Sequence, residues 1–137
     1  MSDSEQFQRI MNDHPALCDE GYDPLRVRED NEYHLMLANC VEEFVVAREW
    51  IAKNLLHSKR INPRRSSYGM KHVMERDIGI YVSEGSFIAA MLVNEFRMEA
   101  KSGYSPSFNV REISVRRIEK RISITGRAAV VKMVRQR

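Results

Sequence analysis

The pattern of apolar and polar positions predicts a helical chain organised on one long helix. Between residues 31 and 57, apolar side chains recur every three or four positions, which is the spacing of one face of an α-helix. This stripe consists of Tyr33, Leu37, Val41, Phe44, Ala47, Ile51 and Leu55. A helix over 31–57 would be roughly 40 Å long, more than a small globular domain needs. We therefore expect its excess length to pack against a second copy of the chain in a homodimer.

A helical hairpin over residues 67–97 is predicted to pack on the long helix. Ser66 or Ser67 precedes the first apolar run as a helix cap, and Gly79 follows its end. Ser83 precedes the second run, which is almost wholly apolar. The expected core consists of Leu37, Val41, Phe44, Ile51, Leu55, Val73, Phe87, Ile88, Met91 and Leu92. The predicted fold class is therefore all-α, a single small helical domain over residues 1–137.

Charge is distributed unevenly between the two ends of this domain. Residues 1–32 carry nine acidic and three basic residues, so 1–30 forms an acidic N-terminal segment. Residues 101–137 carry ten basic and two acidic residues, and we take 111–137 as a basic C-terminal tail. We expect a helix in this tail through about Arg121, and the pattern over 122–137 is compatible with helix, strand or disorder. The asymmetry indicates a polyanionic partner, two ends that screen each other, or an ordinary solvated surface.

Composition excludes several classes of protein. No apolar run approaches the roughly 18 residues of a membrane span, and the first ten residues are acidic and polar. We therefore expect a cytoplasmic protein that does not associate with a membrane. Two cysteines cannot make a disulfide scaffold, and the histidines and cysteines lack metal-ligand spacing. Without a glycine-rich phosphate loop either, we expect no metal and no cofactor.

One group of residues has the composition of a catalytic site. Tyr68, Lys71, His72 and Glu75 lie at helical spacing and share one face of the predicted helix. A histidine beside a glutamate can perform acid–base chemistry, but on a helix surface such a pair is more often structural. The carboxylates of Glu42 and Glu43 are likewise expected in water. We therefore expect no enzyme, and catalysis at this cluster is the least favoured alternative.

The hairpin shape of 66–97 resembles a helix-turn-helix, the motif that places its second helix in the major groove of DNA. The second helix, however, offers few side chains that could read base edges. Nucleic-acid contacts are instead expected from basic residues around the hairpin, which would bind phosphates. The candidates are Arg60, Arg64, Arg65, Lys71, Arg116, Arg117, Lys120 and Arg121.

Three short motifs carry a resemblance to a known group of proteins. They are Ser-Tyr-x-x-Lys-His from Ser67, Tyr-Val-Ser-x-Gly-x-Phe-Ile-x-Ala from Tyr81, and Pro-x-Phe-Asn from Pro106. Together they resemble an uncharacterised family of small proteins encoded by bacteriophages, plasmids and prophages, over roughly residues 66–110. That family usually has glycine or another small residue at the position of Glu95. The resemblance implies an accessory protein of a mobile element and assigns no functional residue.

The expected function is therefore binding rather than catalysis. The first hypothesis is a nucleic-acid-binding or regulatory module that uses the basic linker and tail. The alternative is a protein-interaction module that inhibits a host defence or replication complex, with the acidic segment mimicking nucleic acid. Salt-sensitive DNA binding would distinguish the first from the second.

Overall fold

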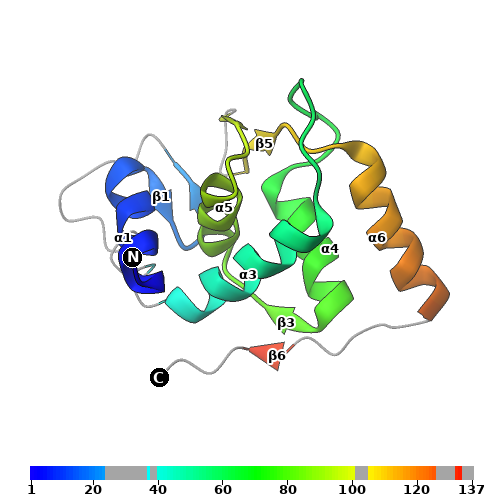
Figure 1. The fold of residues 1–137 in the computed structure, drawn as a ribbon, viewed down its shortest axis with the longest axis horizontal. Coiled ribbons are helices and arrows are strands. Elements are labelled where there is room, and N and C mark those ends of the chain that lie inside the picture. The colour runs from blue at the N-terminus through cyan, green and yellow to red at the C-terminus, as the bar shows by residue number, and fades with distance from the viewer. Residues whose placement is uncertain (24–36, 38–39, 101–104, 126–131, 134–137) are drawn as a thin grey trace.

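The structure is a computed structural model that describes residues 1–23, 37, 40–100, 105–125 and 132–133 (Figure 1). The described helices are α1 (Asp3–Asp13), α3 (Val41–Asn54), α4 (Ser67–Ile78), α5 (Glu84–Val93) and α6 (Glu112–Thr125). Short strands connect them: β1 (Leu17–Cys18), β2 (Gly21–Tyr22), β3 (Ile80–Tyr81), β4 (Met98–Glu99), β5 (Ser107–Phe108) and β6 (Lys132–Met133). The fold is thus mainly helical, as predicted, with small two-stranded sheets that the prediction did not include.

Helix α5 is the centre of the fold. It packs against α3, α1, α4 and the β1–β2 hairpin (Figure 1). All its residues from Glu84 to Met91 are buried, because a helix without a polar face is stable only when other elements surround it. The expected core is confirmed: eight of its members are buried, and Val41 and Leu92 pack against it half-buried.

The prediction of one helix over 31–57 is wrong. Helix α3 begins at Val41, after the non-helical Cys40, and ends at Asn54, where Leu55 takes an extended conformation. Its 14 residues span about 21 Å. Leu37 and Leu55 are buried although they lie outside α3, so the apolar periodicity marked the core and not the length of the helix. The excess length that suggested a homodimer is absent from α3, and the predicted start, within 24–36, lies outside the described residues.

Two helices lie within the predicted hairpin over 67–97 and have the predicted caps, but α5 ends at Val93, four residues before the predicted end. Ser66 Oγ accepts a hydrogen bond from the amide of Gly69 at 3.1 Å, and Gly79 ends α4 in the left-handed conformation with φ 72°. Ser83 Oγ accepts from the amide of Ser86 at 3.2 Å at the start of α5. These polar side chains satisfy amide groups that have no partner within the helix, and so they fix where each helix begins.

The basic tail is helical through Thr125, slightly beyond the predicted end. Beyond this helix the structure describes only β6, which pairs in parallel with β3. Helices α1 and α6, which belong to the acidic and the basic segment, lie at opposite ends of the molecule (Figure 1). Among the described helices, none is long and apolar enough to cross a bilayer.

Candidate functional site: a basic face and a polar cavity

The basic linker and the start of α6 form one surface. Backbone amides of Ser58 and Asn62 donate to the carbonyls of Asn109 and Phe108, at 2.8 and 2.9 Å. The buried Asn62 side chain donates to the carbonyl of Val110 at 3.2 Å and to Glu112 at 3.0 Å. Two basic segments that lie about 50 residues apart in the sequence are thereby held together.

A shallow groove of about 260 Å³ lies on this surface. Arg60, Arg64 and Arg111 line it, and all three side chains are exposed. The sequence had pointed to Arg60 and Arg64. Arg111 was missed because only the folded chain brings it beside the linker. Arg116, Arg117 and Lys120 are exposed on α6 and extend the positive surface. We call these six residues and the linker 58–65 the basic face.

Arg65, which we had predicted to bind phosphate, is used inside the fold. Its Nη2 lies 2.7 Å from Glu112 Oε2 and 2.8 Å from Glu119 Oε1. The guanidinium hydrogen bonds hold the pKa of Glu112 at about 2, well below its usual 4.5. The same bonds raise the pKa of Arg65 above its usual value. Arg65 therefore joins the linker to α6 and has no free edge for a phosphate.

Two more predicted phosphate contacts are ion-paired. Arg121 Nη2 lies 2.6 Å from Asp77 Oδ2, and the same oxygen accepts from Trp50 Nε1 at 2.9 Å. Lys71 is 4% exposed and pairs with Glu75. Arg116 Nε also reaches Glu112 at 3.2 Å, but its side chain remains 61% exposed. Lys71 and Arg121 therefore stabilise the fold, whereas Arg116 remains accessible.

The helix-turn-helix interpretation is also corrected. Helix α5 would have to enter the major groove, yet it is buried from Glu84 to Met91 at the centre of the domain. Any contact with nucleic acid would come from the basic face.

A second candidate site is a cavity of about 510 Å³ beside α4, the start of α5 and the turn between β1 and β2. Its lining is polar and consists of Asp19, Glu20, Tyr68, Lys71, His72, Tyr81, Ser83 and Glu84. Three members of the predicted α4 cluster are among them. The others come from three separate elements, so no spacing in the sequence could have grouped them.

Lys71 lines this cavity and forms an ion pair with Glu75, which is not itself a lining residue. Lys71 Nζ lies 2.8 Å from Glu75 Oε2 and 4.6 Å from the centre of the Tyr81 ring. His72 Nδ1 lies 3.1 Å from Glu75 Oε1, and the amide of Val82 donates to Oε2 at 3.2 Å. The Glu75 side chain is only 5% exposed, so the pair that we expected on the surface has a buried carboxylate.

Three acidic residues line the cavity: Asp19, Glu20 and Glu84. Glu84 Oε2 accepts hydrogen bonds from Ser67 Oγ and Ser105 Oγ, both at 2.7 Å, and burial raises the pKa of Glu84. Asp19 Oδ1 is buried, and among the described residues it has no hydrogen-bond partner. Burial raises the pKa of Asp19 as well. Buried acids with raised pKa values in a cavity are typical of functional sites.

The start of α5 explains part of this concentration of acid. A helix N-terminus carries partial positive charge, which carboxylates stabilise. Glu43, which we had expected in water, is buried and accepts a hydrogen bond from the amide of Ser83. At Gly85 a Cβ would lie 2.0 Å from the carbonyl oxygen of Cys18, so only glycine lets α5 approach the β1–β2 turn.

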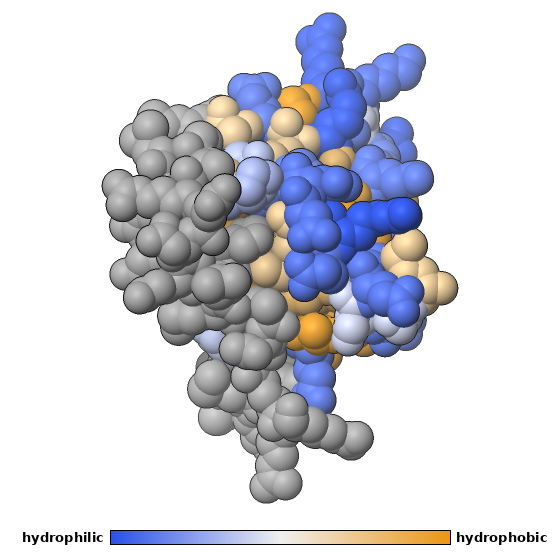
Figure 2. Space-filling view, turned by 90° about the vertical axis from the view of Figure 1, so that its left-hand side faces the viewer, coloured by the Kyte–Doolittle hydropathy of each residue, from blue (hydrophilic) through white to orange (hydrophobic). Residues whose placement is uncertain are grey.

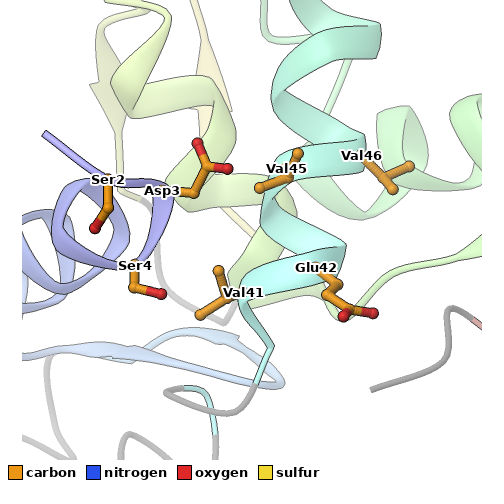
Figure 3. A pocket seen from close by; sticks show the side chains of 7 residues that line it. All are labelled: Ser2, Asp3, Ser4, Val41, Glu42, Val45 and Val46. Carbon is orange, nitrogen blue, oxygen red and sulfur yellow. The ribbon is translucent and has the colours of Figure 1, made fainter. Parts of the chain in front are cut away.

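A third hollow lies between the start of α1 and α3 (Figure 3). Its volume is about 520 Å³, and the half-buried Val41, Val45 and Val46 line it together with Asp3 and Glu42. Asp3 is ion-paired with Arg48 at 2.8 Å. On the face of the molecule seen in Figure 2, hydrophilic side chains cover most of the described surface and leave only small apolar areas between them.

Among the described residues, no group of three histidine, cysteine, aspartate or glutamate side chains is placed to hold a metal ion. Comparisons of the chain with protein-family models, with curated proteins and with solved structures find no match.

Proposed function

We propose that this protein binds nucleic acid through phosphate contacts on its basic face. The observation that carries the proposal is the imbalance of charge on this surface. Residues 58–65 and 109–125 contain nine basic residues and two acidic ones, Glu112 and Glu119. Arg65 binds both of these acids. Arg116 also contacts Glu112 and Arg121 pairs with Asp77, while the other cations of these segments face water with little compensation.

Five of these cations are the expected phosphate ligands. Arg60, Arg64, Arg111, Arg117 and Lys120 are exposed, and none of them forms an ion pair with a carboxylate in the part of the chain that the structure describes. Three arginines converge on one groove, where guanidinium groups can bind phosphate oxygens in a bidentate manner. Such contacts supply affinity and position but no sequence preference.

The proposed phosphate contacts should make the affinity for DNA strongly dependent on salt concentration. Each phosphate contact releases counterions, which gives a slope of log K against log salt concentration of about −0.9 per contact on duplex DNA. Five contacts would give a slope of about −4.5. A partner bound through few charged contacts would show a much smaller slope of log K against log salt concentration.

The test is a titration of a fluorescent random-sequence duplex and a single strand at several salt concentrations, followed by anisotropy. The variant is Arg60→Ala/Arg64→Ala/Arg111→Ala, which removes three positive charges from the groove. The matched control is Arg9→Ala/Lys53→Ala/Arg76→Ala, which removes the same charge from exposed positions outside the basic face. We expect the groove variant to lose most of the affinity and about three units of the slope.

Two results would contradict the proposal. One is the absence of binding by the wild-type protein at low salt. The other is an equal loss of affinity in the two triple variants, which would show that net charge alone attracts the nucleic acid.

The resemblance over residues 66–110 supports a place for this activity in a mobile genetic element. An accessory protein there would act by binding, so the proposal does not include catalysis. This context predicts that the protein acts on nucleic acid in the bacterial cytoplasm.

The alternative is a protein-interaction module, and the hollow between α1 and α3 favours it. The three half-buried valines offer apolar contact, and Glu42 adds negative charge at the rim (Figure 3). Its occupant would be an apolar segment with basic flanks from a host complex. Val45→Asp would abolish such binding and leave DNA binding unchanged, which separates the two functions.

A further inference from the structure

The polar cavity beside α4 and α5 is a site that the proposed function does not use. It shares no lining residue with the groove of the basic face. Its lining includes three acidic residues but only one lysine, so it attracts charge opposite to that of a phosphate. Its volume of about 510 Å³ falls within the range of small-molecule sites.

One side of the cavity shows how this protein accommodates a cation. The ammonium group of Lys71 is almost fully buried, which is costly unless the charge is paired. Glu75 supplies a carboxylate at 2.8 Å, and Tyr81 supplies an aromatic ring at 4.6 Å. A carboxylate and a ring face are the two features that bind a desolvated ammonium group.

Other lining residues offer the same two features to a second cation. Asp19 Oδ1 is buried and has no hydrogen-bond donor among the described residues, so no donor of the described chain compensates this oxygen of the carboxylate. Glu84 is 7% exposed, and its hydrogen bonds from Ser67 and Ser105 both reach Oε2. Tyr68 lies at the cavity with its side chain 52% exposed. Lys71, the lysine that lines the cavity, is already ion-paired with Glu75.

We propose that this cavity binds a small organic cation, an amine or a guanidinium compound, between the carboxylates of Asp19 and Glu84 and the ring of Tyr68. The positive charge of the ligand pairs with the carboxylates of Asp19 and Glu84, both of which line the cavity. Tyr68 covers it as Tyr81 covers Lys71. An anion is disfavoured by the acidic lining, and a neutral apolar ligand would cover the carboxylates without neutralising their charge.

The test uses agmatine, which carries a guanidinium and an ammonium group, and measures binding to the full-length protein by calorimetry and by amide chemical shifts. Its uncharged control is 1,4-butanediol, which has the same four-carbon spacer. We expect saturable binding of agmatine with a Kd of about 1 mM or lower, and none of the diol. The shifted amides should be those of residues 19–21, 67–72 and 81–85.

Variants of the lining residues separate this site from general attraction to an acidic surface. Asp19→Asn and Glu84→Gln keep the shape of each side chain and remove its charge, and each should weaken binding at least tenfold. Tyr68→Leu should weaken it about two- to fivefold, the size of a partly exposed cation–π contact. Asp13→Asn removes an equal charge from an exposed position of α1 and should leave binding unchanged.

Two outcomes would overturn the proposal: no saturable binding of agmatine to the wild-type protein, or equal binding by the wild-type, Asp19→Asn and Tyr68→Leu proteins. Tyr68 is exposed and Asp19 lies in a turn, so both variants should fold even if Glu84→Gln does not. Because DNA binding is measured separately, failure here leaves the proposal for the basic face untouched.

Discussion

Arg64 and Arg65 are neighbours in the sequence, yet the structure predicts opposite consequences of removing them. Arg65 donates hydrogen bonds to both carboxylate oxygens of Glu112 and to both of Glu119, at 2.7–3.3 Å. Arg64 is exposed and lines the groove. Arg65→Ala should therefore destabilise the fold, whereas Arg64→Ala should weaken DNA binding and leave stability unchanged.

The lowered pKa of Glu112 sets the magnitude for Arg65→Ala. A shift from 4.5 to about 2 corresponds to about 3 kcal/mol of stabilisation of the carboxylate. Asn62 and Arg116 contribute to this shift, and the side chains of Arg65 and Glu112 are 19% and 23% exposed, so solvent weakens the pair. Arg65 therefore accounts for about 2 kcal/mol, which corresponds to a fall of roughly 4–8 °C in Tm.

The pH dependence follows from the direction of the shift. Because the pKa of Glu112 is lowered in the folded protein, its contribution is complete above pH 4.5 and is lost as the pH falls through 2. The difference in stability between the wild type and Arg65→Ala should thus be constant near neutral pH and shrink between pH 4.5 and 2.

Urea unfolding followed by the fluorescence of Trp50, the only tryptophan, measures this difference. Trp50 is buried and hydrogen-bonded to Asp77, so unfolding changes its environment. DNA titrations of the two single variants complete the comparison: Arg64→Ala should reduce the salt slope by about one unit, and Arg65→Ala should not. Equal stability of Arg65→Ala and the wild type would refute the assignment of Arg65 to the fold, as would equal DNA defects in the two variants.

Three further predictions concern the stability of the fold. Glu95 follows α5 with φ 66°, and the amides of Glu95 and Phe96 donate to the carbonyls of Leu92 and Met91. Because a left-handed conformation strains any residue except glycine, Glu95→Gly should stabilise the protein by about 1 kcal/mol in urea unfolding. A loss of stability would contradict this explanation of how α5 ends. Gly85→Ala should destabilise by about 3 kcal/mol or more because its Cβ meets the carbonyl of Cys18, whereas Gly69→Ala, with only Ser66 Oγ at 3.5 Å, should stabilise by about 0.5–1 kcal/mol. The opposite signs of these two glycine variants in thermal unfolding are the check. Lys71→Ala should destabilise by about 3 kcal/mol because it removes the ammonium group from the buried Glu75, which keeps only His72 and the Val82 amide as partners among the described residues. Lys71→Met/Glu75→Leu should recover most of that loss, and a double variant as unstable as the single one would argue against the buried charge as the cause.

Only part of the polar cavity could be predicted from the sequence. The helical spacing correctly grouped Tyr68, Lys71 and His72 on one face of α4, because neighbours three and four positions apart must lie together on a helix. It could not add Asp19 or Glu84, which reach the same cavity from a β-turn and from the start of another helix. The signal that was available, a serine cap followed by a glutamate, also has an ordinary explanation in the helix dipole.

For the basic residues too, the sequence predicted which segments are positive but not which side chains are accessible. Composition identified the linker and the tail, but it treated Arg64 and Arg65 as equivalent. Only the folded chain places Glu112 and Glu119 around the guanidinium of Arg65. It likewise brings Arg111 to the groove that Arg64 lines. Whether a charged side chain is available to a partner depends on its neighbours in space, and those neighbours are about 50 residues away.

The sequence by itself determined the local structure: a mainly helical chain, the hairpin with its serine caps and Gly79 stop, a helical tail, and the residues of the core. These follow from capping and periodicity, which act over a few residues. The tertiary structure decided the extent of α3, the central place of α5, and which charged groups are buried. Those outcomes depend on packing between segments distant in the sequence, because the same apolar spacing continues wherever a chain faces the core, inside a helix or beyond its end.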